Sequence, residues 1–174
     1  VLDLRLNYLN KYVDKFVIVE SLFFHNGRPK KLLFDIKKFS NFKEKIVYLI
    51  IDHEPHDIED IKENDSIEVN NSKHILNGMK RDFYQTNYIQ KALSESSDND
   101  IIFISDIDEI PKLDNFNINL IKDDIIFFKQ KMFYYKFNLC SQSIDWFGTR
   151  ACKKKKLLSP QWLRNIKAKK YPIW

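Results

Sequence analysis

The stretch IIFISDIDEIP, residues 101–111, joins a short apolar run to three carboxylates and a closing proline. Four consecutive apolar residues without polar alternation are typical of a strand that is buried on both faces, as in a parallel sheet. Residues 16–19 and 46–51 have the same character, and residues 2–13 and 79–95 carry apolar side chains at helical spacing. Strands that alternate with helices predict an α/β sandwich with a mostly parallel central sheet.

The remainder of the chain is expected to complete this sandwich. Residues 125–128 and 132–137 are predicted to form two further strands, which would add a mixed or antiparallel edge to the sheet. Residues 56–77 are polar and irregular, which indicates a surface loop. Ser159 before Pro160 predicts a helix over residues 160–168, because serine is a favoured N-cap and proline suits the first helical position.

Length and composition indicate one compact domain. The chain has 174 residues, 44% of them hydrophobic, and its sequence contains neither a repeat nor an apolar segment long enough to span a membrane. The net charge of +5 is uneven, because residues 1–145 carry 20 − 24 = −4 and residues 146–174 carry +9. Basic residues gathered at one end argue against a nucleic-acid partner. Two cysteines, Cys140 and Cys152, do not make a disulfide framework.

The carboxylates after residue 104 lie where open α/β sheets bind ligands, just beyond the carboxyl end of a strand. Asp106 and Asp108 are two positions apart, so in extended backbone their side chains point the same way. A hard divalent cation such as Mn²⁺ or Mg²⁺ would relieve their repulsion and leave positions for phosphate oxygens. The competing interpretation is a solvated turn that ends a buried strand.

Two enzyme classes use an Asp-x-Asp motif after an apolar strand. In one, a metal-dependent phosphohydrolase, Asp106 would be the nucleophile, but the motif normally lies near the start of the fold. In the other, nucleotide-sugar transfer on a GT-A fold, the motif follows several strands, as it does here. The position of the motif favours glycosyl transfer. A fragment that binds carbohydrate without catalysis is the alternative outside the enzymes.

At this point the sequence resembles glycosyltransferase family 17, whose best-known member adds a bisecting β-1,4-linked N-acetylglucosamine to the mannose core of glycoprotein glycans. The motifs that carry the resemblance extend over nearly the whole chain. They are LDLRLN at residues 2–7, VDKFVIVES at 13–21, NGRPK at 26–30, RDFYQTN at 81–87, SDIDEIP at 105–111, WFG at 146–148 and SPQWLR at 159–164.

The resemblance implies a UDP-sugar donor, with UDP-N-acetylglucosamine favoured, and transfer with inversion to a saccharide hydroxyl of a glycan acceptor. Asp106 and Asp108 are then expected to hold Mn²⁺ or Mg²⁺, which neutralises charge on the departing diphosphate. The residues expected to bind the nucleotide sugar are Glu20, Ser21, Arg81, Gln85, Asp106 and Trp146. The plainer interpretations are a strand-end cap for Glu20 and a surface side chain for Arg81.

The predicted catalytic residues are Asp145 and Glu109. Asp145 is the candidate base because Trp146 offers a face for a sugar ring and Gly148 allows close backbone approach. Glu109 is expected either to support the metal ligands or to stabilise the turn. Asp145 as an ordinary loop residue is the alternative interpretation.

The sequence also departs from the family pattern. Thr86 stands where the family commonly has arginine, which puts a phosphate contact there in doubt. Two parts of the family pattern are not recognised in these residues. One is the strand that usually precedes the first helix, and the other is the segment that usually follows the last motif. We therefore expect residues 1–174 to be a single catalytic domain that is truncated at both ends and lacks its first strand. The composition favours a microbial or viral source and a cytoplasmic location, or the Golgi lumen for an animal-type relative.

Overall fold

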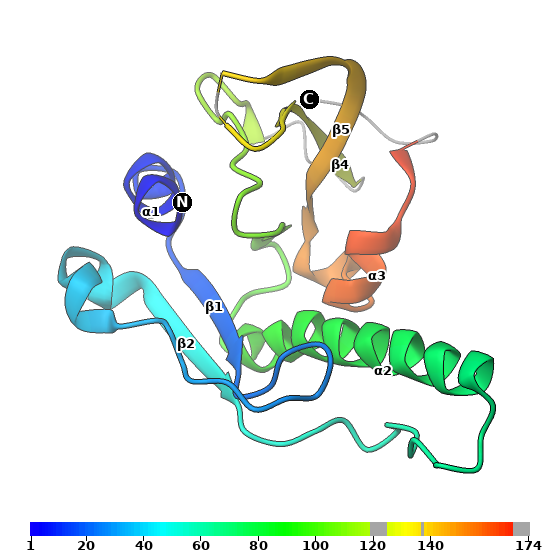
Figure 1. The fold of residues 1–174 in the computed structure, drawn as a ribbon. Helices are drawn as coiled ribbons and strands as arrows, with labels where there is room; N and C mark the ends of the chain where they lie inside the picture. The colour runs from blue at the N-terminus through cyan, green and yellow to red at the C-terminus, as the bar shows by residue number, and fades with distance from the viewer. Residues whose placement is uncertain (119–124, 137, 169–174) are drawn as a thin grey trace. The chain divides into compact units, whose positions relative to one another are not determined.

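The computed structural model of the chain describes residues 1–118, 125–136 and 138–168 (Figure 1). The chain divides into two compact units: unit 1 comprises residues 1–14 and 95–174, and unit 2 comprises residues 15–94. Unit 1 is therefore built from two separate stretches of the sequence. The single catalytic domain, truncated at both ends, stays a prediction.

Unit 2 contains two parallel strands, β1 (Phe16–Ser21) and β2 (Ile46–Ile51), paired in register from their first residues to their last. The carboxyl ends of the two strands therefore lie at one edge of the pair. A 3₁₀ segment, η1 (Ile36–Lys45), leads directly into β2. Both strands were expected from their apolar runs, and their parallel pairing confirms that part of the prediction.

A long helix, α2 (Ile67–Tyr88), contacts both strands of unit 2 and continues into a 3₁₀ segment, η2 (Ile89–Leu93) (Figure 1). It begins at Ser66, whose hydroxyl accepts a hydrogen bond from the backbone N–H of Val69. This is an N-cap bond, which satisfies one of the free donors at the start of a helix.

The helix starts twelve residues earlier than the predicted residue 79, so the predicted loop over residues 56–77 is wrong for its second half. The first turns of α2 have no buried apolar stripe, because Ile67 and Ile75 are exposed. The buried side chain of this region is Asn77, whose amide bonds both the N–H and the C=O of Glu59, at 2.9 and 2.8 Å. A polar anchor of this kind leaves no apolar periodicity in the sequence.

Unit 1 contains an antiparallel sheet in the order β3 (Ile101–Ile104), β5 (Cys140–Lys153), β4 (Ile126–Phe133). The prediction of a mostly parallel sheet therefore holds for β1 and β2 and is wrong for β3. A continuous apolar run indicates burial of a strand but not the direction of its neighbour.

The neighbour of β3 in the sheet, β5, was not predicted from the sequence. It contains charged residues and a glycine in place of a continuous apolar run. The two strands expected over residues 125–128 and 132–137 form one strand, β4, with register shifts where polar residues follow its apolar start. The end of the second prediction, at Phe137, lies outside the described residues.

Two helices complete unit 1, α1 (Leu2–Leu9) and α3 (Pro160–Asn165), and α3 contacts β3 and β5. Leu6 of α1, Phe127 of β4 and Leu163 of α3 are fully buried, so each element contributes to the core of this unit. Both helices are shorter than predicted. The predicted start of α3 is confirmed, since the Ser159 hydroxyl accepts a hydrogen bond from the N–H of Trp162. In the described ranges no helix has the length and apolarity to cross a membrane.

Candidate functional site

The acidic turn after β3 is held by its own backbone and by α1. The N–H of Glu109 donates to the C=O of Asp106 at 3.1 Å, which closes the turn. The Arg5 guanidinium donates to the C=O of Asp106 and of Glu109, at 3.0 and 2.9 Å, and also to the Ser105 hydroxyl. The turn is thus fixed through its main chain, while the side chains of Asp106 and Asp108 remain exposed.

Glu109 differs from the two aspartates because its carboxylate is used inside the protein. One oxygen, Oε2, accepts the backbone N–H of Asp106 at 2.8 Å, and the other, Oε1, accepts the indole Nε1–H of Trp146 at 2.9 Å. Its backbone C=O also accepts the Thr149 hydroxyl at 3.0 Å. Glu109 therefore connects the acidic turn to strand β5.

The contact between this carboxylate and β5 requires a glycine. A Cβ placed on Gly148 would lie 2.4 Å from the carboxylate carbon of Glu109 and 2.7 Å from Oε1 of Gln130. With any larger residue, the Glu109 carboxylate and the Gln130 side chain would have to move from their present positions. The glycine of the WFG motif thus has a defined role in the close approach of a side chain to the strand.

The charges of the turn affect one another. Burial raises the pKa of Glu109, and the nearby negative charges of Asp106 and Asp108 raise it further, although hydrogen bonds from Asp106 and Trp146 act in the opposite direction. The two aspartates thus disfavour the ionised form of the Glu109 carboxyl, as neighbouring like charges do.

Three arginines surround the turn. Arg164 of α3 forms an ion pair with Asp106, with Nη2 and Oδ2 separated by 3.1 Å. Arg150 of β5 donates to the C=O of Gly148 at 2.8 Å and of Ile166 at 3.2 Å, and it interacts electrostatically with Glu109 and Asp106. Together with Arg5, these side chains bring three positive charges to three negative ones.

The donor set of this turn fits a divalent cation that is shared with a ligand. Within the described part of the chain, no group of three or more His, Cys, Asp or Glu side chains is arranged to hold a metal. Asp106 and Asp108 offer two exposed carboxylates, and Mg²⁺ is commonly bound through one or two carboxylates together with phosphate oxygens and water. The arrangement therefore fits an ion completed by a diphosphate and does not fit a closed structural metal site.

Asp145 is not brought together with this cluster. It lies inside β5 and forms an ion pair with Lys129 of β4, with Nζ and Oδ1 2.6 Å apart. Successive residues of a strand point to opposite faces, so Asp145 points away from the face on which Trp146 meets Glu109. Its role as catalytic base stays a prediction.

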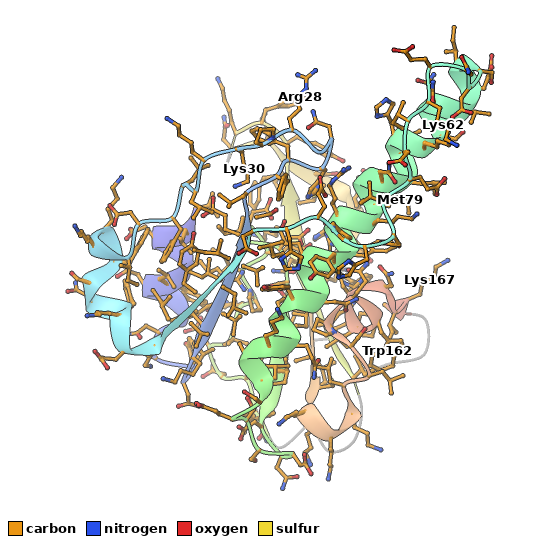
Figure 2. All side chains as sticks on the ribbon, turned by 90° about the horizontal axis from the view of Figure 1, so that it is seen from below. Arg28, Lys30, Lys62, Met79, Trp162 and Lys167 are labelled. Atoms are coloured by element: carbon orange, nitrogen blue, oxygen red, sulfur yellow. The ribbon has the colours of Figure 1, made fainter. Side chains whose placement is uncertain are left out.

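The remaining predicted donor residues belong to unit 2, where they make internal bonds. The Glu20 carboxylate accepts four hydrogen bonds, from Lys30 Nζ (2.9 Å), the N–H of Leu33 (2.7 Å), the N–H of Phe34 (3.0 Å) and the Tyr48 hydroxyl (2.9 Å). These bonds hold the segment that follows β1 against the strand pair. Arg28 of the same segment is exposed and points away from it (Figure 2).

The bonds of Glu20 outweigh the cost of its burial. Burial alone would raise the pKa of this carboxyl, but the four donors lower it from 4.5 to about 2. Burial and the bond to Glu20 raise the pKa of Tyr48 to about 12.

Arg81, Gln85 and Ser21 likewise bind neighbouring parts of unit 2. The Arg81 guanidinium makes a two-pronged ion pair with Glu54, at 2.8 and 3.0 Å, and donates to the C=O of His25 at 3.0 Å. Gln85 Nε2 donates to the C=O of Val19 in β1 at 3.2 Å. Ser21 is buried, and its hydroxyl accepts the N–H of Phe23 at 3.1 Å. These contacts tie α2 and the loop after β1 to the strands.

A glycine permits the loop to lie against Arg81. Gly27 has a φ of +83°, and a Cβ there would lie 2.6 Å from Nη2 of Arg81. The N–H of Gly27 donates to the C=O of Phe24 at 2.8 Å, which closes a turn at this position.

Comparison with known families decides the assignment. A family model described as glycosyltransferase family 17 matches residues 1–158. The chain belongs to glycosyltransferase family 17. Comparisons with curated proteins and with solved structures give no match.

Membership of family 17 confirms the resemblance seen in the sequence and identifies the chain as a glycosyltransferase. It also decides between the two enzyme classes that use an Asp-x-Asp motif, in favour of glycosyl transfer over phosphate hydrolysis. The residue roles of the site are not part of this assignment, and they stay predictions.

The site contains residues that the sequence reasoning missed, namely Arg5, Arg150 and Arg164. None of them lies near the acidic turn in sequence, and Arg5 is 101 positions from Asp106. Composition held one available signal. The chain has only five arginines among its 29 basic residues, and three of these five converge on this turn.

Proposed function

We propose that the chain transfers a sugar from a UDP-sugar donor, with N-acetylglucosamine favoured, to a saccharide hydroxyl of a glycan acceptor, with inversion and with Mn²⁺ or Mg²⁺. The observation that carries the proposal is the fixed turn with two exposed carboxylates, Asp106 and Asp108, in a chain of glycosyltransferase family 17. The parallel strands of unit 2, with α2 against them, support a GT-A-like arrangement.

Asp106 and Asp108 would hold the cation, and the main chain between them would stay in place because Arg5 binds two of its carbonyls. A divalent ion at this position would neutralise charge that develops on the departing diphosphate. A turn that is fixed before the donor arrives needs no reorganisation during the reaction, which is the main source of electrostatic catalysis.

Glu109 acts in this proposal as a positioning residue. Its carboxylate fixes the indole of Trp146, which is 39% exposed and offers an apolar face for a sugar ring. The same carboxylate also accepts the N–H of Asp106. Glu109 would therefore position both a proposed metal ligand and the indole proposed to contact the sugar. Asp145 would be the acceptor base only if it left its ion pair with Lys129.

Within unit 2, Glu20, Ser21, Arg81 and Gln85 stay the residues proposed to bind the nucleotide sugar, and they order the edge at which β1 ends. The Glu20 carboxylate already accepts four hydrogen bonds, so a direct contact with uracil would have to replace one of them. The Arg81 guanidinium uses three of its five N–H donors on Glu54 and His25, so a contact with phosphate could use the others. Ser21 and Gln85 also stabilise this edge, Ser21 by accepting the N–H of Phe23 and Gln85 by donating to the C=O of Val19.

The decisive experiment is calorimetric titration of the chain with UDP, with and without Mn²⁺, followed by measurement of UDP released from UDP-N-acetylglucosamine with a saccharide acceptor. We expect UDP binding that requires Mn²⁺. Asp108→Asn should weaken that binding about tenfold or more, because removal of a charged partner costs about 1.5–3 kcal/mol. Asp98→Asn is the matched control, since Asp98 is an exposed aspartate of the same unit.

A folded Asp108→Asn variant that binds UDP with Mn²⁺ as the wild type does would refute the metal assignment. Metal-independent binding of a saccharide with no UDP binding at all would instead favour a non-catalytic carbohydrate-binding role. Release of phosphate from phosphate esters, with trapping by beryllium fluoride, would support the phosphohydrolase alternative.

A further inference from the structure

The ion pair between Arg164 and Asp106 places a positive charge on the carboxylate that is proposed to hold the metal. Nη2 of Arg164 lies 3.1 Å from Oδ2 of Asp106, and the two side chains are 27% and 50% exposed. A cation and a guanidinium compete for this oxygen, because both bind a carboxylate through its negative charge.

The other two arginines of the site are bound differently. Arg5 donates to two backbone carbonyls and a hydroxyl, and Arg150 donates to two backbone carbonyls. Their guanidinium groups hold the main chain in place. Arg164 binds a side-chain carboxylate that is half exposed, and loss of this ion pair would leave the main-chain bonds of the turn in place.

The net charge of the cluster indicates why Arg164 would exchange a carboxylate for a phosphate. Asp106, Asp108 and Glu109 together carry three negative charges, and the three arginines carry three positive ones. The cluster is therefore neutral, and a divalent cation would leave it with two positive charges. The diphosphate of a nucleotide sugar carries two negative charges, which would restore neutrality.

We propose that Arg164 is the exchangeable counter-ion of this site, which neutralises Asp106 before metal binds and contacts the donor diphosphate afterwards. Guanidinium suits this exchange because its planar donors match carboxylate and phosphate oxygens equally well. Arg164 is then a residue that determines affinity for the diphosphate and opposes metal binding in the absence of the nucleotide. The proposal rests on the proposed function, since it assumes a metal-bound diphosphate at the turn.

The test uses Arg164→Gln and two separate titrations. In the first, Mn²⁺ alone is titrated and followed by electron paramagnetic resonance. The variant should bind Mn²⁺ about two- to five-fold more tightly, because removal of a partly exposed ion pair frees Asp106. In the second, UDP is titrated at saturating Mn²⁺, and the variant should bind about tenfold more weakly, because a charged hydrogen bond to phosphate is lost.

Lys167→Gln is the matched control, because the substitution also removes one positive charge. Lys167 lies in the segment after α3, and its exposed side chain points away from that helix (Figure 2). This variant should change neither titration by more than about twofold. Arg164→Lys keeps the charge without the planar fork, and it should leave Mn²⁺ binding near the wild-type value while weakening UDP binding.

The opposite signs of the two effects distinguish this role from a structural one. If Arg164→Gln weakens the binding of both Mn²⁺ and UDP, or changes neither affinity, the exchange is refuted even though the wild-type chain binds UDP with Mn²⁺. If the wild-type chain shows no Mn²⁺-dependent UDP binding, the proposed function fails first and the role of Arg164 fails with it.

Discussion

The half-buried carboxylate of Glu20 should stabilise the protein by an amount that depends on pH in a defined way. In the folded protein this carboxylate accepts two backbone N–H groups, the Lys30 ammonium and the Tyr48 hydroxyl. In Glu20→Gln, one acceptor oxygen becomes an NH₂ group that faces these donors. The variant should therefore be less stable at neutral pH.

The magnitude follows from the pKa of the carboxyl. A decrease from 4.5 in the unfolded chain to about 2 in the folded one corresponds to about 3 kcal/mol of stabilisation when the group is ionised. Because the folded pKa is the lower one, this stabilisation is complete above about pH 5 and decreases as the pH falls toward 2. More than half of it should be lost by about pH 3.

Urea unfolding at pH 7 and at intervals down to pH 3 measures this directly. Circular dichroism at the helix band reports on unit 2, because α2, the longest helix among the described residues, lies there. Tryptophan fluorescence reports on unit 1, since all three tryptophans lie after residue 145. The wild type should be about 3 kcal/mol more stable than Glu20→Gln at pH 7, and this difference should shrink with acidity.

Glu63→Gln is the matched control, because Glu63 is an exposed glutamate of the same unit. It should change the free energy of unfolding by less than about 0.5 kcal/mol at every pH. The reasoning is wrong if the difference between wild type and Glu20→Gln stays constant between pH 7 and pH 3. A constant difference would mean that packing, and not the ionised carboxylate, provides the stability.

Two further predictions concern unit 1. Gly148→Ala should displace the Glu109 carboxylate, weaken Mn²⁺-dependent UDP binding in calorimetry and lower the free energy of unfolding by about 1–3 kcal/mol; unchanged UDP binding would contradict the positioning role of Glu109. Phe127→Ala should cost about 3–5 kcal/mol in urea unfolding, because the ring is fully buried, whereas Phe133→Ala on the same strand should cost much less, since that ring is 42% exposed; equal losses would contradict the assignment of the core.

The elements that the sequence predicted correctly are those whose burial is visible in a local pattern. The apolar runs of β1, β2 and β3 gave the strands, and the Ser-Pro pair gave the start of α3. The first half of α2 was missed because a polar anchor, Asn77, fixes it and apolar side chains do not. The antiparallel partner of β3 was missed because β5 mixes charged and small residues.

The candidate site shows the same division. The Asp-x-Asp spacing predicted two carboxylates that point the same way from extended backbone. The structure has both exposed, on a turn closed by the bond from the N–H of Glu109 to the C=O of Asp106. The three arginines around the turn could not be found by spacing, because tertiary contacts bring them together from α1, β5 and α3. Nor does the sequence reveal that Glu20 and Arg81 bind partners inside the protein, since hydrogen bonds between distant residues leave no local motif.

The split construction of unit 1 has a consequence for the order in which the chain can fold during its synthesis. The main-chain carbonyl of Glu109 that Arg5 binds is 104 positions further along the sequence. At a translation rate of about 5–20 residues per second, α1 waits roughly 5–20 seconds for that partner to leave the ribosome. Residues 15–94 are synthesised well before then, so unit 2 can fold before α1 can bind the acidic turn through Arg5.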